Sequence, residues 1–315
     1  MLYLINDAPD PLFMTFLLAL ASSIVLFLAS VTVILFFVGP TLLLKPRRRG
    51  AEFYRALGLP TLPSDTGLEY ESIGLRTDDG LNLKCWLIKA PPGSSGTILY
   101  LHGVGDCKID GIRLAKLLHV HGFNVFLYDS RRHGESDGAC CTYGFYEKRD
   151  VSAIIDALER RSDLALGKIG IFGTSMGAAV ALQAGALDRR VAAIVAENSF
   201  ATLRSIFDDY QRRMIKLPFH FLRNLVIHRS EIIAGFKARD VSPLEAVAAI
   251  RVPVLFVYGE NDRLINHQYS ISLYENMKGQ KDIFPIEQAS HNNAWEIAGE
   301  AYEQKIVGFF ERNLR

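Results

Sequence analysis

The sequence of 315 residues predicts an α/β fold, with a mostly parallel, doubly wound sheet of eight strands and one transmembrane helix in front of it. Continuous apolar runs predict strands buried on both faces, and the helical stretches that alternate with them predict a parallel sheet. The transmembrane helix is predicted because no charged residue occurs from residue 11 to residue 44. The 49% of hydrophobic residues and the net charge of +1 fit a globular protein and argue against a nucleic-acid binder, which usually has a strongly basic face.

The first predicted element is a membrane anchor over residues 1–45. Its densest apolar part, residues 12–38, is longer than the about 20 residues that a helix needs to span a bilayer. Asp7 and Asp10 precede this run and no basic residue does, whereas a signal peptide has a basic start and a shorter apolar region. An uncleaved anchor is therefore favoured over a signal peptide and over a helix buried in the core.

Basic residues directly follow the predicted span and indicate its orientation. They are Lys45, Arg47, Arg48 and Arg49. The positive-inside rule places them on the cytoplasmic side, which predicts an outside N-terminus and a cytoplasmic globular domain. Residues 46–67 are expected to form a connector with a short helix over 52–57, and residues 68–315 are expected to form the domain.

Eight strands are expected in this domain. Residues 68–76 and 81–89 alternate apolar and polar side chains around a turn, which predicts a hairpin of half-exposed strands. Six continuous apolar runs predict the other strands, over residues 97–101, 124–128, 168–172, 191–195, 253–257 and 282–286. Helices are expected over residues 108–121, 146–161, 178–187, 267–277 and 294–312.

One segment, about residues 200–250, breaks this alternation and is too long for a simple crossover. It mixes large apolar residues with basic ones: Phe207, Tyr210, Met214, Phe219, Phe221 and Leu222 with Arg204, Arg212, Arg213, Lys216, Arg223 and Arg229. We predict that this segment forms a helical cap over the functional site. The alternative is a plain crossover helix with a solvated basic face.

The segment most informative about chemistry is Gly173-Thr174-Ser175-Met176-Gly177. It lies between a predicted buried strand and an Ala-rich helical stretch, which is the order of a nucleophile elbow. A serine on so sharp a turn has a strained backbone, and only small neighbours let the chain turn so tightly. Ser175 is therefore the candidate nucleophile, and the backbone N–H of Met176 is a candidate donor to an oxyanion.

A serine hydroxyl needs a base to take its proton and a carboxylate to orient that base. Among the eight histidines we select His291, because it lies in a polar loop after the last predicted strand, where ligands of open α/β sheets bind. The acid is expected after the preceding strand. Asp262 is favoured there, with Glu260 as its rival and Glu287 as a third candidate.

The second donor of an oxyanion hole is expected in the loop after residues 97–101. This loop reads His102-Gly103-Val104-Gly105-Asp106, and its glycines let the backbone approach a ligand closely. We assign the N–H of Val104 as the second donor, beside that of Met176. His102 is interpreted as a residue that packs this loop rather than as a base.

The cysteines do not indicate a metal site. Cys85, Cys107, Cys140 and Cys141 lack the C-x-x-C spacing, and we interpret them as ordinary thiols rather than as a disulfide framework or zinc ligands. A bridge stays open only if the domain faces an oxidising compartment. We expect the chemistry to need neither a metal nor an organic cofactor.

Five motifs together resemble the α/β-hydrolases. They are Leu101-His102-Gly103, residues 129–138, residues 173–177, Gly259-Glu260-Asn261-Asp262 and Ser290-His291. The chain looks like the serine hydrolase branch that holds the membrane-anchored α/β-hydrolase-domain proteins related to bud-emergence proteins, and like the prolyl-aminopeptidase-like hydrolases. The resemblance covers residues 68–310 and implies a structural role for Asp129 and His133. Arg132 stands where such proteins often have glycine.

These observations lead to three functional hypotheses. The first is a membrane-anchored serine hydrolase whose cytoplasmic catalytic domain cleaves an ester or thioester of an acyl lipid or small acylated molecule through an acyl-enzyme. Its basic, aromatic cap is expected to rest on anionic lipid head groups. The second is a serine peptidase with the same triad, which extra acidic residues that bind a substrate amine would favour. The third is a catalytically silent, membrane-bound scaffold.

Overall fold

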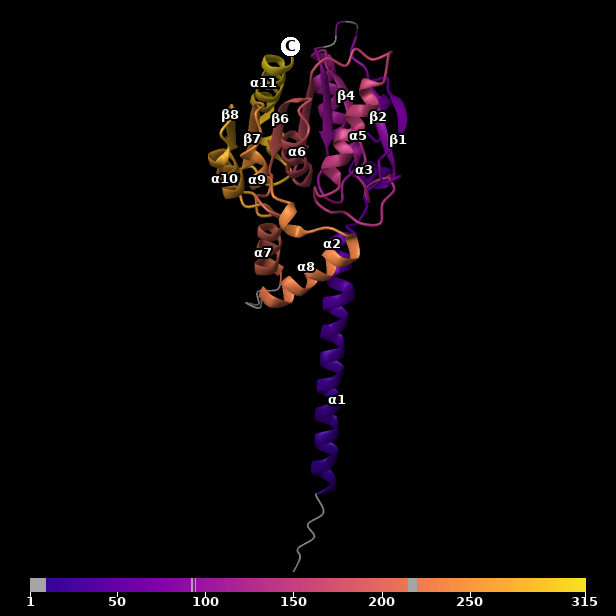
Figure 1. The fold of residues 1–315 in the computed structure, drawn as a ribbon, viewed down its shortest axis with the longest axis vertical. Coiled ribbons are helices and arrows are strands. Elements are labelled where there is room, and N and C mark those ends of the chain that lie inside the picture. The colour runs from indigo at the N-terminus through magenta and orange to yellow at the C-terminus, as the bar shows by residue number, and fades with distance from the viewer. Residues whose placement is uncertain (1–9, 92, 94, 215–219) are drawn as a thin grey trace, which may run out of the picture.

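The computed structural model describes residues 10–91, 93, 95–214 and 220–315. Asp7, Lys216 and Phe219, on which the predictions above drew, lie outside these ranges, as do the first nine residues of the predicted anchor. The described chain forms a compact head on a long helical stem (Figure 1). The stem is helix α1 (Pro11–Val33), which continues through a π-helical turn, η1 (Ile34–Val38), into α2 (Gly39–Leu44).

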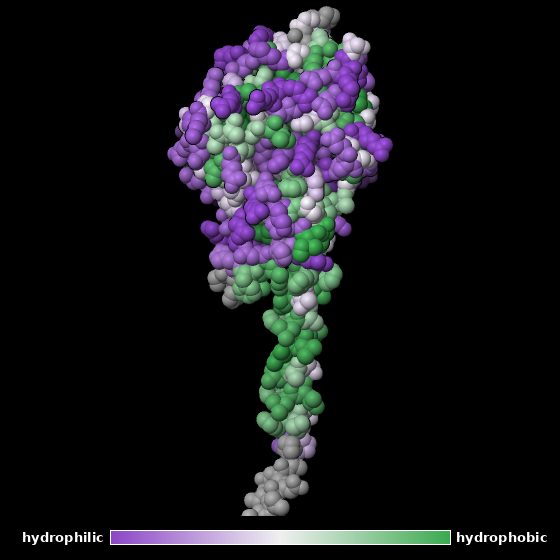
Figure 2. All heavy atoms as spheres, in the orientation of Figure 1, coloured by the Kyte–Doolittle hydropathy of each residue, from purple (hydrophilic) through white to green (hydrophobic). Residues whose placement is uncertain are grey.

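The stem is long and apolar enough to cross a membrane. Its 34 residues, Pro11–Leu44, contain none of the four charged residue types. The side chain of Asp10 caps its first turn by accepting a hydrogen bond from the N–H of Leu12 at 2.9 Å. No residue of α1 is buried and most of its large apolar side chains are exposed, whereas Pro40 and Leu44 of α2 are buried. Figure 2 shows this stem as a continuous hydrophobic column below a largely hydrophilic head.

The head is built on one sheet of eight strands, which confirms the predicted fold class. In chain order they are β1 (Glu71–Arg76), β2 (Asn82–Ile88), β3 (Thr97–Leu101), β4 (Asn124–Tyr128), β5 (Ile169–Thr174), β6 (Val191–Glu197), β7 (Val254–Gly259) and β8 (Lys281–Ile286). Their order across the sheet is β1-β2-β4-β3-β5-β6-β7-β8. Only β2 runs antiparallel to its neighbours, β1 and β4, and all other pairs are parallel.

Helices cover both faces of the sheet, so alternate side chains of the central strands enter two separate apolar layers. Leu99 of β3 points into one layer and Ile98 into the other. The first layer is closed by α5 (Glu147–Glu159), α6 (Met176–Leu187), α9 (Pro243–Val247) and α10 (Gln268–Asn276). The second is closed by α3 (Ala51–Ala56), α4 (Ile112–Val120) and α11 (Ala294–Leu314). Burial on both faces explains why these strands are apolar without alternation.

The segment expected to be a connector packs against the head instead. Tyr54 of α3 is buried, and its hydroxyl donates a hydrogen bond to the carboxylate of Asp106. Arg49 forms an ion pair with the same carboxylate at 2.8 Å and stacks on the ring of Phe53. Two partners for one carboxylate, together with a buried aromatic ring, hold this segment in place.

The insertion between β6 and β7 is helical. It contains α7 (Leu203–Met214), α8 (His220–Ala234), a 3₁₀ turn, η4 (Ala238–Asp240), and α9. Two long helices on the side of the sheet where β6 ends form a cap, rather than the single crossover helix of the alternative (Figure 1). The cap reaches the stem, because α8 packs against both η1 and α2. The carboxyl ends of the parallel strands therefore face the stem.

Candidate active site

Ser175 lies on the sharp turn between β5 and α6. Its backbone has φ 55° and ψ −117°, a conformation that non-glycine residues adopt rarely and at a cost of about 1–3 kcal/mol. The two flanking glycines are sterically required. A Cβ at Gly177 would lie 2.0 Å from the carbonyl oxygen of Leu101, and one at Gly173 would lie 2.4 Å from that of Gly177. The turn is therefore held in a strained form by close packing of the backbone around it.

His291 and Asp262 meet Ser175 from two different loops. His291 follows β8, and its Nε2 lies 3.0 Å from the Ser175 hydroxyl. Its Nδ1 lies 2.6 Å from Oδ2 of Asp262, which follows β7. The other oxygen of Asp262 accepts hydrogen bonds from the backbone N–H groups of Leu264 and Ile265 at 2.7 and 2.9 Å. The carboxylate is thus fixed on the imidazole, the geometry that a base and its orienting acid need.

The rival acids lie elsewhere. Glu260 and Glu287 are both exposed, and the carboxylate that accepts the hydrogen bond of His291 is that of Asp262. His102 is also accounted for, because one of its ring nitrogens contacts the carbonyl of Gly103 at 2.8 Å and the other accepts from the N–H of Ser130 at 3.0 Å. Burial lowers the pKa of His102. Both ring nitrogens therefore hold loops together, as the sequence predicts.

The two proposed oxyanion donors border the nucleophile. A Cβ at Gly103 would lie 3.4 Å from the Cβ of Ser175, so the loop that carries Val104 passes directly over the serine. Val104 lines the same cavity as Ser175, and Met176 is the next residue along the turn. Within the described ranges, neither the N–H of Val104 nor that of Met176 donates a hydrogen bond to another group of the protein. Both donors remain available to a ligand.

Asn198 is a residue of the site that the sequence did not indicate. It directly follows β6 and has φ 52°, which asparagine tolerates better than most residues. Its side-chain N–H donates to the carbonyl of His291 at 3.0 Å, and its side-chain oxygen accepts from the N–H of Gly259 at 3.1 Å. Asn198 therefore ties the loop of the histidine to the strand that leads to Asp262.

A cavity of about 470 Å³ opens beside Ser175 and His291. Aromatic side chains line much of it, including Tyr54, Tyr100, Phe172, Trp295 and Tyr302. Four carboxyl groups also line it, those of Asp106, Asp110, Glu197 and Glu296. The sequence did not predict this acidic lining, because its members come from three separate segments of the chain.

Three of these carboxyl groups accept hydrogen bonds from tyrosine hydroxyls, and for Asp106 the donor is Tyr54. Tyr100 donates to Asp110, and Tyr302 donates to Glu197. Among the described residues, neither Asp110 nor Glu197 has an ion-pair partner, unlike Asp106 with Arg49 and Glu296 with Arg113. Burial raises the pKa of Glu197 to about 7. Desolvation at the cavity wall and the nearby charge of Asp106 raise the pKa of Asp110 as well.

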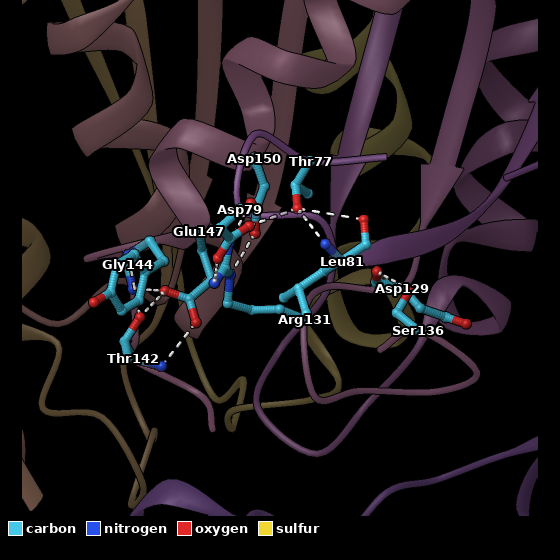
Figure 3. A network of polar contacts seen from close by, with 11 residues as sticks. Thr77, Asp79, Leu81, Asp129, Arg131, Ser136, Thr142, Gly144, Glu147 and Asp150 are labelled. Carbon is cyan, nitrogen blue, oxygen red and sulfur yellow. Dashed lines mark hydrogen bonds and ion pairs between the residues drawn. The ribbon is translucent and has the colours of Figure 1, made fainter. Parts of the chain in front are cut away.

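The loop after β4, residues 129–138, is held by a separate polar network (Figure 3). Arg131 donates to the carboxylate of Asp150 at 2.5 and 2.7 Å and to that of Asp79 at 2.9 Å. Glu147 accepts from the N–H and hydroxyl of Thr142 and from the N–H of Gly144 at 2.6–2.8 Å. The contacts of Arg131 fix this loop, and those of Glu147 fix the segment that follows it.

Asp129 extends this network on the other side of the loop. It is fully buried and paired with Lys108, whose Nζ lies 2.6 Å from its carboxylate and whose N–H donates to it at 2.7 Å. His133 is buried and binds the carbonyl of Arg131 through Nδ1. Both residues have the structural role that the resemblance implies. Arg132 has φ 68°, which explains why glycine suits this position.

Fold and site together define the class of protein. The sheet has eight mostly parallel strands, a serine lies on the strand–turn–helix elbow, and a histidine and an acid follow neighbouring strands. This is the arrangement of the α/β-hydrolases. A model of the alpha/beta hydrolase fold family matches residues 96–243. The protein YqkD of Bacillus subtilis is 32% identical over 224 residues, which cover 70% of this chain and 73% of YqkD. The chain therefore belongs to the α/β-hydrolase family.

Two further similarities extend this assignment. The protein bem46 of Schizosaccharomyces pombe is 27% identical over 261 residues, which cover 81% of each chain, so the predicted relation to bud-emergence proteins is confirmed. Among solved structures, the esterase Pf2001 of Pyrococcus furiosus superposes with a TM-score of 0.70 at 25% identity. That comparison covers 87% of this chain and 98% of the esterase. The comparisons therefore support a hydrolase with the α/β-hydrolase fold whose structural neighbours include esterases.

Proposed function

We propose that this protein is a membrane-anchored serine hydrolase that cleaves a carboxylic ester or thioester through an acyl-enzyme on Ser175. The observation that carries the proposal is the continuous hydrogen-bonded chain from Ser175 through His291 to Asp262 at the edge of a cavity. A lone serine on a tight turn has several explanations, but a serine with an oriented base has the parts of an activated nucleophile.

In the proposed reaction, Oγ of Ser175 attacks the acyl carbonyl while Nε2 of His291 takes the hydroxyl proton. Asp262 stabilises the imidazolium and stays ionised. The N–H groups of Val104 and Met176 bind the oxyanion of the tetrahedral intermediate. His291 then gives its proton to the leaving alcohol or thiol, and the acyl group stays on Ser175. A water molecule, deprotonated by His291, attacks the acyl-enzyme and releases the carboxylic acid.

The stem supports membrane anchoring. In the proposed topology, α1 spans the bilayer and the basic residues after Leu44 keep the catalytic domain in the cytoplasm. The substrate is then an acyl lipid or another acylated molecule that reaches the membrane surface. A tag at the C-terminus should resist protease in intact cells and be digested after permeabilisation; digestion in intact cells contradicts this topology.

The test of the reaction uses hydrolysis of a small p-nitrophenyl ester by the full chain. Ser175→Ala and His291→Ala should each lower kcat by on the order of 10⁶-fold, because the triad acts as a unit. Ser162→Ala, at an exposed turn, is the matched control and should keep full activity. Unchanged hydrolysis in the Ser175 variant, with unchanged thermal unfolding, would refute the proposal.

A second candidate is hydrolysis of an ester or amide whose acyl part carries an amine, as in a peptidase. The observation that favours it is the pair of carboxyl groups, Asp110 and Glu197, that line the cavity without an ion-pair partner among the described residues. An ammonium group would supply that partner. The measurement is kcat/KM for aminoacyl esters and amides against analogues without the amine. A preference of 10-fold or more for the amine favours this candidate, and equal or inverse rates favour the first.

The third hypothesis, a silent scaffold, receives no support from the site, because serine, base and acid are all present and in contact. Labelling of Ser175 by a fluorophosphonate probe separates both enzymatic candidates from this one.

A further inference from the structure

Helix α8 of the cap has apolar side chains on the face that points away from the head. Its inner face is defined by Ile227 and Ser230, which are buried. Phe221, Leu225 and Ile232 share the opposite face, because they follow one another at helical spacing. Phe221 is 64% exposed and Ile232 is 57% exposed. An exposed apolar face on a helix that already packs on its other side indicates a second apolar environment.

This helix is attached to the stem. The contact between the stem and α8 is close at Gly39, where the π-helical turn passes into α2. A Cβ at Gly39 would lie 2.9 Å from Cγ2 of Val226 in α8, so a glycine permits this close approach of α2 and α8. In Figure 1, α8 crosses the stem at the junction with the head. Figure 2 shows hydrophobic surface that continues from the stem onto this underside of the head. The level of α8 along the stem is therefore fixed.

That level coincides with the edge of a bilayer. The 23 residues of α1 span about 34 Å at 1.5 Å per residue, close to the about 30 Å of a hydrocarbon core. Asp10 marks the outer end of this length, since a carboxylate caps the first turn there. The other end falls at Val33, directly before the turn on which α8 packs. The outward face of α8 then lies at the boundary of acyl chains and head groups.

The charge of the cap fits the same location. Residues 203–240 contain eight basic and four acidic residues. Arg204, Arg212, Lys237 and Arg239 are exposed. Basic residues near the cytoplasmic leaflet gain about 1 kcal/mol each from anionic lipids. An apolar helix face with basic residues beside it is the pattern of a helix that lies in the plane of the membrane surface.

We infer that α8 is an interfacial helix that lies in the head-group layer, with Phe221, Leu225 and Ile232 among the acyl chains and the basic residues of the cap on anionic head groups. The inference rests on the membrane anchoring in the proposed function. The inference also narrows the substrate of the proposed function, because Tyr210 of the neighbouring α7 lines the catalytic cavity. The cap thus connects the cavity to the lipid surface, and the substrate class becomes an acyl ester held in the bilayer.

The test uses tryptophan fluorescence of the full chain in vesicles of phosphatidylcholine and phosphatidylglycerol that contain lipids with a doxyl quencher near the head group. Phe221→Trp and Ile232→Trp should be quenched several-fold more than Val120→Trp. Val120 is the matched control, because it is 69% exposed and ends α4 shortly before β4 begins, which places it at the amino ends of the parallel strands. The unmodified chain gives the baseline of Trp86 and Trp295.

A third variant separates this inference from the anchoring on which it rests. Leu20→Trp, in the middle of α1, reports insertion of the stem through quenching by lipids with the doxyl group deep in the acyl chain. If Leu20→Trp is quenched and both α8 variants match Val120→Trp, the anchor stands and the inference is overturned. If Leu20→Trp is not quenched either, the anchoring fails and the inference fails with it. Quenching needs no catalysis, so inactivity in the ester assay affects neither result.

Discussion

Two polar clusters lie beside the same edge of the sheet, and they differ in how their carboxyl groups are paired. Around the loop after β4, Asp129 binds Lys108, and Asp150 of α5 binds Arg131. In the catalytic cavity, Asp110 and Glu197 bind tyrosine hydroxyls, and Asp262 binds a histidine. Carboxylates that are paired with cations fix a loop, whereas Asp110 and Glu197, which have no ion-pair partner among the described residues, can respond to a proton or a substrate. Changes in the first cluster should therefore affect stability, and changes in the second should affect rate.

The largest effect is expected at the acid of the triad. Asp262→Asn keeps the shape of the side chain but favours the wrong tautomer of His291, so kcat for a small ester should fall by about 10⁴-fold. Thermal unfolding should change little. Glu260→Gln, at the exposed rival position, is the matched control and should retain activity within a few-fold. Equal losses in the two variants would show that the acid has been assigned wrongly.

The structural cluster should give the opposite result. Lys108→Met leaves the buried carboxylate of Asp129 without its cation, and such a loss costs about 3–5 kcal/mol of the free energy of unfolding. Denaturant unfolding measures it, with Lys116→Met on the exposed face of α4 as the control. The KM of the remaining folded enzyme should stay the same. A loss of activity without a loss of stability would place Lys108 in the catalytic cluster instead.

Asn198 lies between these two cases, since it pairs with backbone groups of the catalytic loops. Glycine adopts a positive φ without strain, so Asn198→Gly preserves the backbone conformation. The substitution removes both side-chain hydrogen bonds, including the one that holds the backbone of His291. Misplacement of a catalytic group by about 1 Å costs about 10²-fold, and we expect kcat to fall by this factor with little change in KM. An unchanged kcat, or a loss confined to stability, would assign Asn198 to the fold alone.

The smallest effect is expected from the pH response of Glu197. Glutamate titrates near pH 4.3 in an unfolded chain, whereas burial raises the pKa of Glu197 to about 7 in the folded protein. The folded state therefore binds more protons between these values, and the free energy of unfolding falls as the pH rises through this window. Glu197→Gln should remove most of this fall in urea unfolding between about pH 4 and pH 7. The exposed Glu275→Gln controls for the change in charge, and parallel curves for wild type and Glu197→Gln contradict the assignment.

The sequence could predict the parts of this site that local order determines. The strands are recognisable because both of their faces are buried, and Ser175, His291 and Asp262 each follow a strand in a loop of recognisable polarity. Gly173 and Gly177 are predictable because the turn leaves no room for a Cβ. Most of these features are marked by residues that are neighbours in the chain, although the atom that excludes a Cβ at Gly177 belongs to the distant Leu101.

The remaining parts depend on contacts between distant segments. Asn198 binds groups 61 and 93 residues away, and Glu197 meets Tyr302 across 105 residues. Arg49 reaches Asp106 across 57 residues, which turns an expected connector into a wall of the cavity. No spacing pattern in one sequence encodes these pairs, because they follow from how the sheet brings strand ends together. The position of α8 against Gly39 is of the same kind.

The most direct test of the central claim is labelling of the folded full chain with a fluorophosphonate probe, followed by mass spectrometry of its peptides. One adduct is expected, on Ser175, that is absent from heat-unfolded protein and from Ser175→Ala, and that forms much more slowly in His291→Ala. An adduct on another residue, or hydrolysis of the ester by folded protein in which Ser175 stays unlabelled, would contradict this claim.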